Sequence, residues 1–416
     1  MFRHLRTGSI SALLVGVMLL SACGQQAAQP QPTATTPPAA ETPTQAAPLS
    51  EPTPTTGSSM GGGGEVKIGF AFVTSGDNAV YGNSQRAAAE LAIEEINASG
   101  QGPKIVSIFE DTAAKPDQAI TVFQKFINTD KVHAIIGPTL SNEAKSSDPE
   151  AQKAGVPVLA VSNTAAGITD IGDYIFRDSL AESQVIPETI KQAKEKLGLK
   201  KVALLYAKDD AFSKSGADVF RAELQKNGIE IVSEQTFSTN DTDYKAQLTA
   251  IKGLDIDAIV VSALAKPAQT ILQQARNDVG IDPKVHIIGG NGFNSPAVVK
   301  AAGPAAEGVI VGAAWNINAE SELSKKFVEA FRNKYGKDPD QFAAQAYAGV
   351  YILYDAIKRA NIEGKDLAAA RTAIRDALKT ASIDTVLGHF TFTEKRDANH
   401  PPVVQIVQNG TFQILK

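Results

Sequence analysis

Residues that usually carry catalysis are scarce and scattered in this sequence. Its five histidines stand far apart, at positions 4, 133, 286, 389 and 400, and Cys23 is the only cysteine. Metal sites and activated nucleophiles need several such side chains at fixed spacings. No H-E-x-x-H motif occurs, no G-x-S-x-G elbow follows a predicted strand, and nothing in the sequence pairs a nucleophile with a base. We therefore expect neither an enzyme nor a bound metal or cofactor.

Small polar residues instead gather in two segments, 137–142 and 162–166, each after a β-branched run. Backbone N–H groups at a helix start favour a carboxylate or another small anion, and hydroxyl groups add donors. Each side chain taken singly could equally cap a helix or stabilise a turn. The candidate ligand residues in these segments are Ser141, Asn142, Ser162, Thr164 and Ala165.

The corresponding segments in the second half of the chain mix acidic, aromatic, apolar and amide groups. Asp210, with Asp209 beside it, could pair with a ligand cation or belong to a solvated loop with a helix cap. Phe212 could line a cleft or anchor its own helix. Leu264 and Asn291 follow two further predicted strands. These side chains are the second set of ligand candidates.

Short β-branched runs alternate with amphipathic stretches, such as the helix expected over 81–98, and this alternation is typical of parallel sheets with crossover helices. Nine strands exceed one comfortable open sheet, so two sheets are expected. Ligands of such sheets bind outside the carboxyl ends of the strands. The predicted strands are Val66–Phe72, Lys104–Phe109, Val132–Ile136, Val156–Val161, Lys201–Tyr206, Ile229–Glu234, Ala258–Val261, Val285–Ile288 and Gly308–Ala313.

Composition and charge narrow the classes of partner. The chain has 416 residues, more than one average domain, and carries 40 Lys and Arg against 45 Asp and Glu, for a formal net charge of −5. The sequence has no run of basic residues that would attract the phosphate backbone of a nucleic acid, so nucleic acid is excluded as a main partner.

The first 64 residues are predicted to be a targeting segment followed by a tether. Basic residues precede the apolar stretch Ile10–Leu20, which is too short for a spanning helix of about 20 residues, and small residues lead into Cys23. This pattern resembles the bacterial lipoprotein box, so residues 1–22 are predicted to be a signal peptide and Cys23 the lipidated first residue. Residues 23–64, rich in Pro, Thr and Gly, are predicted to be a disordered tether.

Several ordered segments give the remainder a resemblance to a known family. They are Gly69–Gly76 with Tyr81-Gly82, Glu94–Asn97, Ile135–Pro138, Val156–Val158, Ser162–Thr164 and Gly388–Phe392. Together they resemble the type I periplasmic binding proteins of the branched-chain amino-acid transport family, over essentially residues 65–416. The resemblance implies an α/β fold with two Rossmann-like lobes, mainly parallel sheets and a three-crossover hinge. The implied lobes are 65–177 plus 314–398 and 178–313 plus 399–416.

The resemblance also implies a function. The chain would be a lipid-anchored, extracytoplasmic substrate-binding protein that closes on a small carboxylate, such as a branched-chain amino acid, and delivers it to an ABC permease. It would act as a monomer at the outer face of the cell membrane or on the periplasmic side. A ligand sensor for a membrane receptor remains an alternative, as does an enzyme, although the loops offer no activated nucleophile.

Carried over residue by residue, the resemblance assigns the ligand carboxylate to the segments that contain Ser141 and Thr164. It assigns the side-chain pocket to Tyr81 and to an aromatic at Phe212. Where amino-acid binders of the family carry a glutamate for the ligand ammonium, this sequence has Asn291, and Leu264 stands where a tyrosine is common. A neutral amide cannot neutralise a desolvated ammonium. Either Asp209 or Asp210 substitutes, or the ligand is an amine-free aromatic or keto acid or a short amide.

Overall fold

The computed structural model describes residues 64–416. The predicted signal peptide, the predicted lipidation site Cys23 and all of the predicted tether except Gly64 lie outside the described residues. Each of the nine predicted strand regions contains a strand, and the expected helix over 81–98 is present as α1. The chain has the predicted α/β class with mainly parallel sheets.

The first sheet has five strands in the order β2-β1-β3-β4-β5, and all of its neighbours run parallel. In the register, Glu65 lies opposite Lys104 and Ile68 opposite Ala134. The strand β5 was not predicted from the sequence. The strands are β1 (Glu65–Phe72), β2 (Lys104–Asp111), β3 (Ala134–Ile136), β4 (Val158–Ala160) and β5 (Ile175–Arg177).

The second sheet has seven strands in the order β15-β14-β10-β9-β8-β6-β7. Five strands run parallel, and the C-terminal hairpin adds two antiparallel strands at the β10 edge. The strands are β6 (Lys201–Ala207), β7 (Glu230–Phe237), β8 (Ala258–Ser262), β9 (His286–Gly289), β10 (Ile310–Ala313), β14 (Val403–Gln408) and β15 (Thr411–Ile414).

A third, antiparallel sheet, not expected from the sequence, has the order β11-β12-β13. Its strands are β11 (Ser382–Thr385), β12 (Gly388–Phe392) and β13 (Ala398–Asn399). The helices are α1 (Ala79–Ser99), α2 (Pro116–Lys125), α3 (Ser141–Ala154), α4 (Glu182–Leu197), α5 (Ala211–Lys226), α6 (Lys245–Ile251), α7 (Ala265–Gln273), α8 (Pro296–Ala302), α9 (Glu322–Tyr335), α10 (Gln341–Ala360) and α11 (Leu367–Lys379). Shorter turns are η1 (Phe126–Asp130), η2 (Thr169–Ile171), η3 (Gln274–Asp278), η4 (Asn291–Phe293) and η5 (Gly303–Ala306).

Both large sheets are covered on their two faces, as the two-residue period of a strand requires. In β1, Phe70 and Phe72 belong to a core shared with α1 and α10, whereas Ala71 belongs to a core shared with α2 and α3. In β6, Leu204 faces the helices α4 and α5, and Leu205 faces α6 and α7. The near-continuous apolar runs in the sequence are the consequence of this double coverage.

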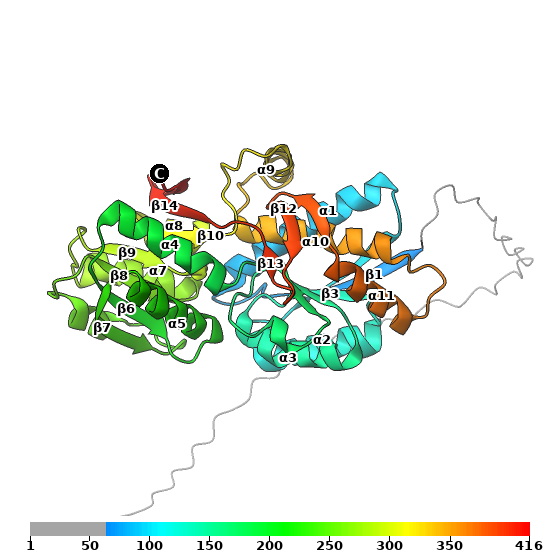
Figure 1. Cartoon of the computed structure of the whole chain (residues 1–416), viewed down its shortest axis with the longest axis horizontal. Coiled ribbons are helices and arrows are strands. Elements are labelled where there is room, and N and C mark those ends of the chain that lie inside the picture. Colours follow the sequence, from blue (N-terminus) through cyan, green and yellow to red (C-terminus); the bar gives the residue numbers. More distant parts are fainter. Residues whose placement is uncertain (1–63) are drawn as a thin grey trace, which may run out of the picture. The chain divides into compact units, whose positions relative to one another are not determined.

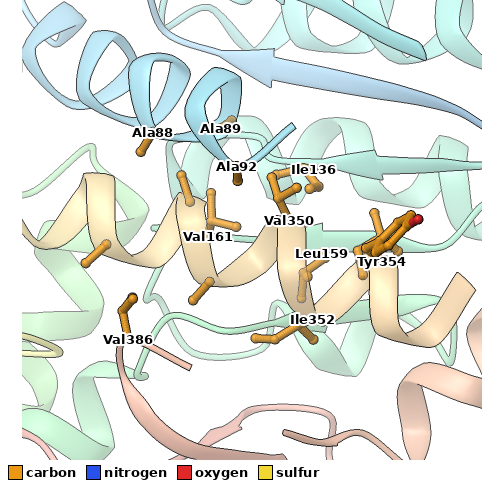
Figure 2. Close-up of a cluster of buried hydrophobic side chains, with 14 of the residues drawn as sticks. Ala88, Ala89, Ala92, Ile136, Leu159, Val161, Val350, Ile352, Tyr354 and Val386 are labelled. Atoms are coloured by element: carbon orange, nitrogen blue, oxygen red, sulfur yellow. The ribbon is translucent and has the colours of Figure 1, made fainter. Parts of the chain in front are cut away.

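Small residues let α1 approach α10 closely. Ala88, Ala89 and Ala92 on α1 share one buried cluster with Val350 of α10 and Ile136 of β3, as Figure 2 shows. The helix α10 is thereby packed against the first sheet although it begins 164 residues after the last strand of that sheet, from Arg177 to Gln341. Figure 1 shows that the C-terminal helices α10 and α11, in orange, lie with the blue and cyan elements from the start of the described chain.

The chain passes between the two large sheets three times. It leaves the first sheet after Arg177, returns after Ala313, and enters the second sheet again between Asn399 and Val403. The predicted lobe boundaries near 177, 314 and 398 stay a prediction, which this strand order supports. Among residues 64–416, no helix combines the length and apolar character that crossing a bilayer requires.

We predict that Gly82→Ala destabilises the fold. A Cβ atom at Gly82 on α1 would overlap the backbone carbonyl of Val73 just after β1, so the helix must shift away from the sheet. The expected loss is about 1–3 kcal/mol of unfolding free energy, measured by urea denaturation. The control is Gly64→Ala, because a Cβ atom there meets nothing within 4 Å. Equal unfolding midpoints for the two variants would contradict the predicted clash.

Candidate ligand-binding site

A small cavity of about 20 Å³ lies where the carboxyl ends of strands from the two large sheets meet. This space holds about one water molecule, so a larger ligand requires the two sides to move apart. The lining residues are Tyr81, Thr139, Leu140, Ser141, Ser162, Asn163, Thr164, Phe212, Leu264, Asn291, Gly292 and Phe342.

The start of α3 forms the polar end of the cavity. The first N–H groups of any α-helix lack partners within the helix, and a polar N-cap side chain usually satisfies one of them. Here the N-cap residue is Leu140, which has no polar side-chain atom, and no side-chain cap hydrogen bond is made. The first turn of α3 therefore keeps N–H donors and the positive end of the helix dipole for an anion.

The hydroxyl of Ser141 is held in place at this helix start. Its Oγ accepts hydrogen bonds from the backbone N–H groups of Thr164, at 3.3 Å, and Ala165, at 3.2 Å. Because the oxygen is already an acceptor twice, its own O–H proton is left to donate to a further group. A carboxylate in the cavity is a suitable acceptor for that proton.

The two polar segments predicted from the sequence are tied to each other. Ser162 Oγ donates to the Thr139 carbonyl at 2.6 Å, and Asn163 Nδ2 donates to the Pro138 carbonyl at 3.0 Å. Gly137 begins the first segment with φ of +113°, where a Cβ atom would also overlap the Ala71 carbonyl. These contacts fix the segments at the strand ends. The hydroxyl proton of Ser162 is therefore used in a hydrogen bond within the protein.

An apolar wall lies across from this polar end. The rings of Tyr81 and Phe342 are 4.6 Å apart between centroids, and Phe212 and Leu264 complete the wall. The Tyr81 hydroxyl donates to the Gly292 carbonyl at 2.7 Å, which joins α1 of the first sheet to the segment after β9 of the second. The lining of the cavity thus combines donors for a carboxylate at one end with apolar contact at the other.

Two further hydrogen-bonded contacts join the halves beside the cavity. Asn142 Nδ2 donates to Asp210 Oδ1 at 3.1 Å, and Asn142 Oδ1 accepts from Ala211 N at 2.9 Å. The Ala166 N–H donates to Ser215 Oγ at 2.9 Å. Asp210 also caps α5, because its Oδ2 accepts from the Ser213 N–H. Burial raises the pKa of Asp210 above its usual range.

Asn291 is connected to the second chain passage through side-chain amides. Its Oδ1 accepts from Gln341 Nε2 at 2.5 Å and from Asn294 Nδ2 at 3.1 Å. Gln341 Oε1 in turn accepts from the Ala314 N–H, directly after β10. Asn291 therefore contributes no charge to the cavity, and its carbonyl oxygen is already occupied.

Two buried glutamates lie close behind the polar end. Glu143 Oε2 accepts from the Leu140 N–H at 2.9 Å, and burial raises the pKa of Glu143 to about 7. Glu182, at the start of α4, accepts from Thr164 Oγ1 at 2.6 Å. Burial raises the pKa of Glu182 to about 7 as well, although the Thr164 hydrogen bond and the charge of Arg177 oppose the shift.

Most of the residues predicted from the sequence meet at this cavity. Seven line it, namely Tyr81, Ser141, Ser162, Thr164, Phe212, Leu264 and Asn291. The other three, Asn142, Ala165 and Asp210, are not lining residues and bond to neighbouring groups instead. Thr139, Leu140, Asn163 and Gly292 belong to the segments singled out in the sequence but were not chosen. Phe342 was missed, because no sequence signal distinguishes it from a core residue of α10.

The structure corrects one expectation about catalysis, since it does bring a serine, a histidine and an aspartate together. Ser382 Oγ is 3.3 Å from His389 Nε2, and His389 Nδ1 is 2.7 Å from Asp384 Oδ1. The register of β11 with β12 sets this arrangement. The side chains of His389 and Asp384 are 61% and 77% exposed. Acyl transfer also needs an oxyanion site and a substrate cavity. Asp384 lines a neighbouring cavity in the described part of the chain, but neither Ser382 nor His389 lines it.

No group of three or more metal-ligating side chains is found among the described residues. The part of the chain that the structure describes thus offers hydrogen bonds, a helix dipole and an apolar wall. These features suit binding.

Comparisons with known proteins agree with the geometry. The family model of the periplasmic binding proteins matches residues 65–411. The Leu/Ile/Val-binding protein homolog 7 of Brucella abortus is 27% identical over 345 residues, which cover 78% of this chain and 84% of the relative.

Two solved structures are also similar to this chain. One is the branched-chain amino acid transporter substrate binding protein LivJ from Streptococcus pneumoniae in complex with isoleucine, which is 32% identical with a TM-score of 0.76, over 84% of this chain and 98% of that chain. The other is a solute binding protein of an ABC transporter from Rhodopseudomonas palustris in complex with 3,4-dihydroxybenzoic acid, which is 26% identical with a TM-score of 0.75, over 84% and 95% of the two chains.

We predict that Glu143 makes the ligand-free protein less stable as the pH rises. Its pKa is about 7 in the folded chain against 4.5 when unperturbed, so the folded state binds the proton more tightly than the unfolded state. Stability is therefore lost as the pH rises from about 4.5 through about 7, by on the order of 3 kcal/mol. Urea unfolding at about pH 5 and pH 8 measures this loss.

The variant Glu143→Gln isolates this contribution, because a glutamine oxygen can still accept from the Leu140 N–H. The variant should show a smaller loss of unfolding free energy across the same pH interval than the wild type. An identical pH dependence in the two proteins would show that Glu143 titrates normally.

Proposed function

Because the chain belongs to the periplasmic binding protein family and is a substrate-binding protein of the branched-chain amino acid ABC transporter type, we propose that it captures a branched-chain amino acid or a related small carboxylate in the cavity between its two large sheets. It is a binding protein and not an enzyme. The proposed ligand residues are the seven predicted from the sequence that line the cavity, with Leu140 and Phe342 added from the structure.

The observation that carries this proposal is the uncapped start of α3 facing an apolar wall. The free N–H groups and the Ser141 hydroxyl provide donors for a carboxylate, while Tyr81, Phe212, Leu264 and Phe342 provide apolar contact. An aliphatic amino acid has these two ends in addition to its ammonium group. The isoleucine complex of the Streptococcus pneumoniae relative supports the same class of ligand.

Capture by hinge closure is the mechanism that we propose. Three chain passages between the sheets would bend, and the contacts of Tyr81 with Gly292 and of Asn142 with Asp210 would form as the two halves close. Closure removes the carboxylate from water, which strengthens its hydrogen bonds with the helix start.

The ligand would then be delivered to an ABC permease. We propose that the chain acts as a monomer outside the cytoplasm, held to the membrane by a lipid on Cys23. A sensor that reports ligand occupancy to a membrane receptor is the alternative use of the same fold. Neighbouring genes for permease and ATPase subunits would favour transport, and a neighbouring gene for a sensor kinase would favour signalling.

A second class of ligand is favoured by one specific observation, the neutral Asn291. An amine-free aromatic or keto acid, or a short amide, would need no counter-charge at that position. The 3,4-dihydroxybenzoic acid complex of the Rhodopseudomonas palustris relative shows that one similar protein binds an amine-free acid. A thermal-shift screen of refolded, ligand-stripped protein against amino acids, keto acids, aromatic acids and short amides separates the classes. A ligand at one hundred times its Kd should stabilise the protein by about 2.7 kcal/mol.

We predict that Ser141→Ala and Thr164→Ala each weaken binding of the identified carboxylate by about 1–3 kcal/mol, because each removes a buried hydrogen-bonding partner. Isothermal titration calorimetry measures the change. Ser146→Ala is the matched control, since Ser146 lies on α3 outside the cavity and bonds only to the Asn142 carbonyl. Unchanged affinity in the Ser141 variant would remove the proposed carboxylate subsite, since the Thr164 hydroxyl already donates to Glu182.

We predict that Cys23→Ser releases the protein from the membrane, because serine cannot carry the thioether-linked lipid. Fractionation of cells into membrane and soluble fractions measures this release. Wild-type protein should stay with the membrane, and a variant that also stays there would indicate a different anchor.

A further inference from the structure

An amino-acid ligand would bring an ammonium group into the cavity, and its counter-charge is not at Asn291. The two acids considered from the sequence are also committed elsewhere. Asp210 accepts from Asn142 and Ser213, and exposed Asp209 accepts from the N–H and hydroxyl of Thr239. An ammonium without a nearby negative charge would be costly to bury.

Glu182 is a carboxyl group that contacts the cavity lining directly. It is only 2% exposed, and its Oε1 accepts from the hydroxyl of Thr164, a lining residue, at 2.6 Å. The Glu182 N–H donates to the Thr164 carbonyl at 3.1 Å, so the two residues are joined twice. This position puts the carboxyl group directly behind the polar end of the cavity.

Glu182 has no ion-pair partner among residues 64–416. The nearby guanidinium of Arg177 is bonded to Asp397 at 2.5 Å and to the Ala165 carbonyl at 2.8 Å. Arg177 thus favours the charged form of Glu182 from a distance without neutralising it directly. The carboxyl group of Glu182 therefore has no direct cationic partner in this part of the chain.

The second carboxylate oxygen of Glu182 points toward the second sheet. Glu182 Oε2 lies 3.5 Å from the place where a Cβ atom of Gly216 on α5 would be, and the hydroxyl of Ser262 approaches the same place. Ser262 Oγ is fully buried and makes no hydrogen bond in the described structure. A Cβ atom at Gly290 would lie 3.5 Å from Ser262 Oγ and 3.7 Å from the ring of Phe212, which lines the cavity.

We propose that Glu182, together with the hydroxyl groups of Thr164 and Ser262, forms the subsite for the ligand's ammonium group. The three oxygens come from α4, from the segment after β4 and from the end of β8, so the subsite spans both halves of the protein. An ammonium has three N–H donors and no acceptor, which matches three oxygen acceptors. This inference rests on the proposed function and deepens it, because it selects amino acids over their amine-free analogues.

The subsite also accounts for the unpartnered hydroxyl of Ser262 and the buried carboxyl group of Glu182. A buried Ser262 Oγ without a partner carries a desolvation cost, and a buried glutamate with a raised pKa carries another. A cation between them would satisfy the hydroxyl and favour the charged carboxylate.

The test compares leucine with 4-methyl-2-oxopentanoate, which differ only at the α-carbon, where the keto acid has an oxo group in place of the ammonium group and the hydrogen. Calorimetric titration of the refolded, ligand-stripped full chain should show that wild-type protein binds leucine. Glu182→Gln should weaken leucine binding at least about tenfold and change the keto-acid affinity by less than about threefold. Glu182→Asp, which keeps the charge, should bind leucine more tightly than Glu182→Gln does.

Two further variants keep the test independent of folding defects. Ser262→Ala should fold normally, because Ser262 Oγ has no partner to lose, and it should weaken leucine binding more than keto-acid binding. Asp148→Asn, at a fully buried carboxyl on α3 that does not line the cavity, should leave the ratio of the two affinities unchanged.

Contrary outcomes separate the two claims. If wild-type protein binds the keto acid and not leucine, the ammonium subsite is overturned while the carboxylate-binding function stands. If Glu182→Gln weakens both ligands equally, Glu182 supports the structure and the subsite is again overturned. If neither leucine, isoleucine, valine nor their keto acids bind, the proposed branched-chain ligand class fails, and the subsite with it.

Discussion

The start of α3 has free N–H donors because the residue before it is Leu140, and the rest of the site is arranged around this property. An uncapped helix start inside a protein is costly unless another group accepts its hydrogen bonds. Gly137 makes the close approach to Ala71 that brings the segment to the strand end, and the contacts with 162–165 hold Ser141 at the helix start. The local sequence is thus explained by a missing acceptor, which a ligand carboxylate would supply.

The second constraint is that the two sides of the cavity belong to different sheets. Polar donors come from the ends of β3 and β4, whereas Phe212, Leu264 and Asn291 follow strands of the second sheet. A ligand that touches both sides favours the closed arrangement by its differential contacts. The amide chain from Asn291 through Gln341 to the Ala314 N–H connects the cavity wall to one of the three passages between the sheets. A ligand that contacts this wall would therefore be physically linked to the chain passage at Ala314.

Much of the fold could be predicted from the sequence, because buried parallel strands read as apolar runs between helices. The strand β5 was missed because its three residues belong to no longer β-branched run, unlike the equally short β3 and β4, and the hairpins near the C-terminus follow no βαβ alternation. Within the site, strand ends identified the segments, but not which partner each side chain faces. Asn142 and Asp210 are an example, since both look like ligand residues until their mutual hydrogen bond is seen. Phe342 and the pairing of Ser382 with His389 depend on tertiary packing and strand register, which single-residue patterns do not encode.

A crystal structure of the complex with the ligand identified by thermal shift would test the central claim most directly, namely that the start of α3 holds the ligand's carboxylate. We predict that one carboxylate oxygen accepts hydrogen bonds from the first-turn N–H groups of α3 and from the Ser141 hydroxyl, with donor–acceptor distances of about 2.7–3.2 Å. We also predict that the apolar part of the ligand contacts Tyr81 and Phe342. A ligand bound with its carboxylate away from α3, or bound outside this cavity, would contradict the claim.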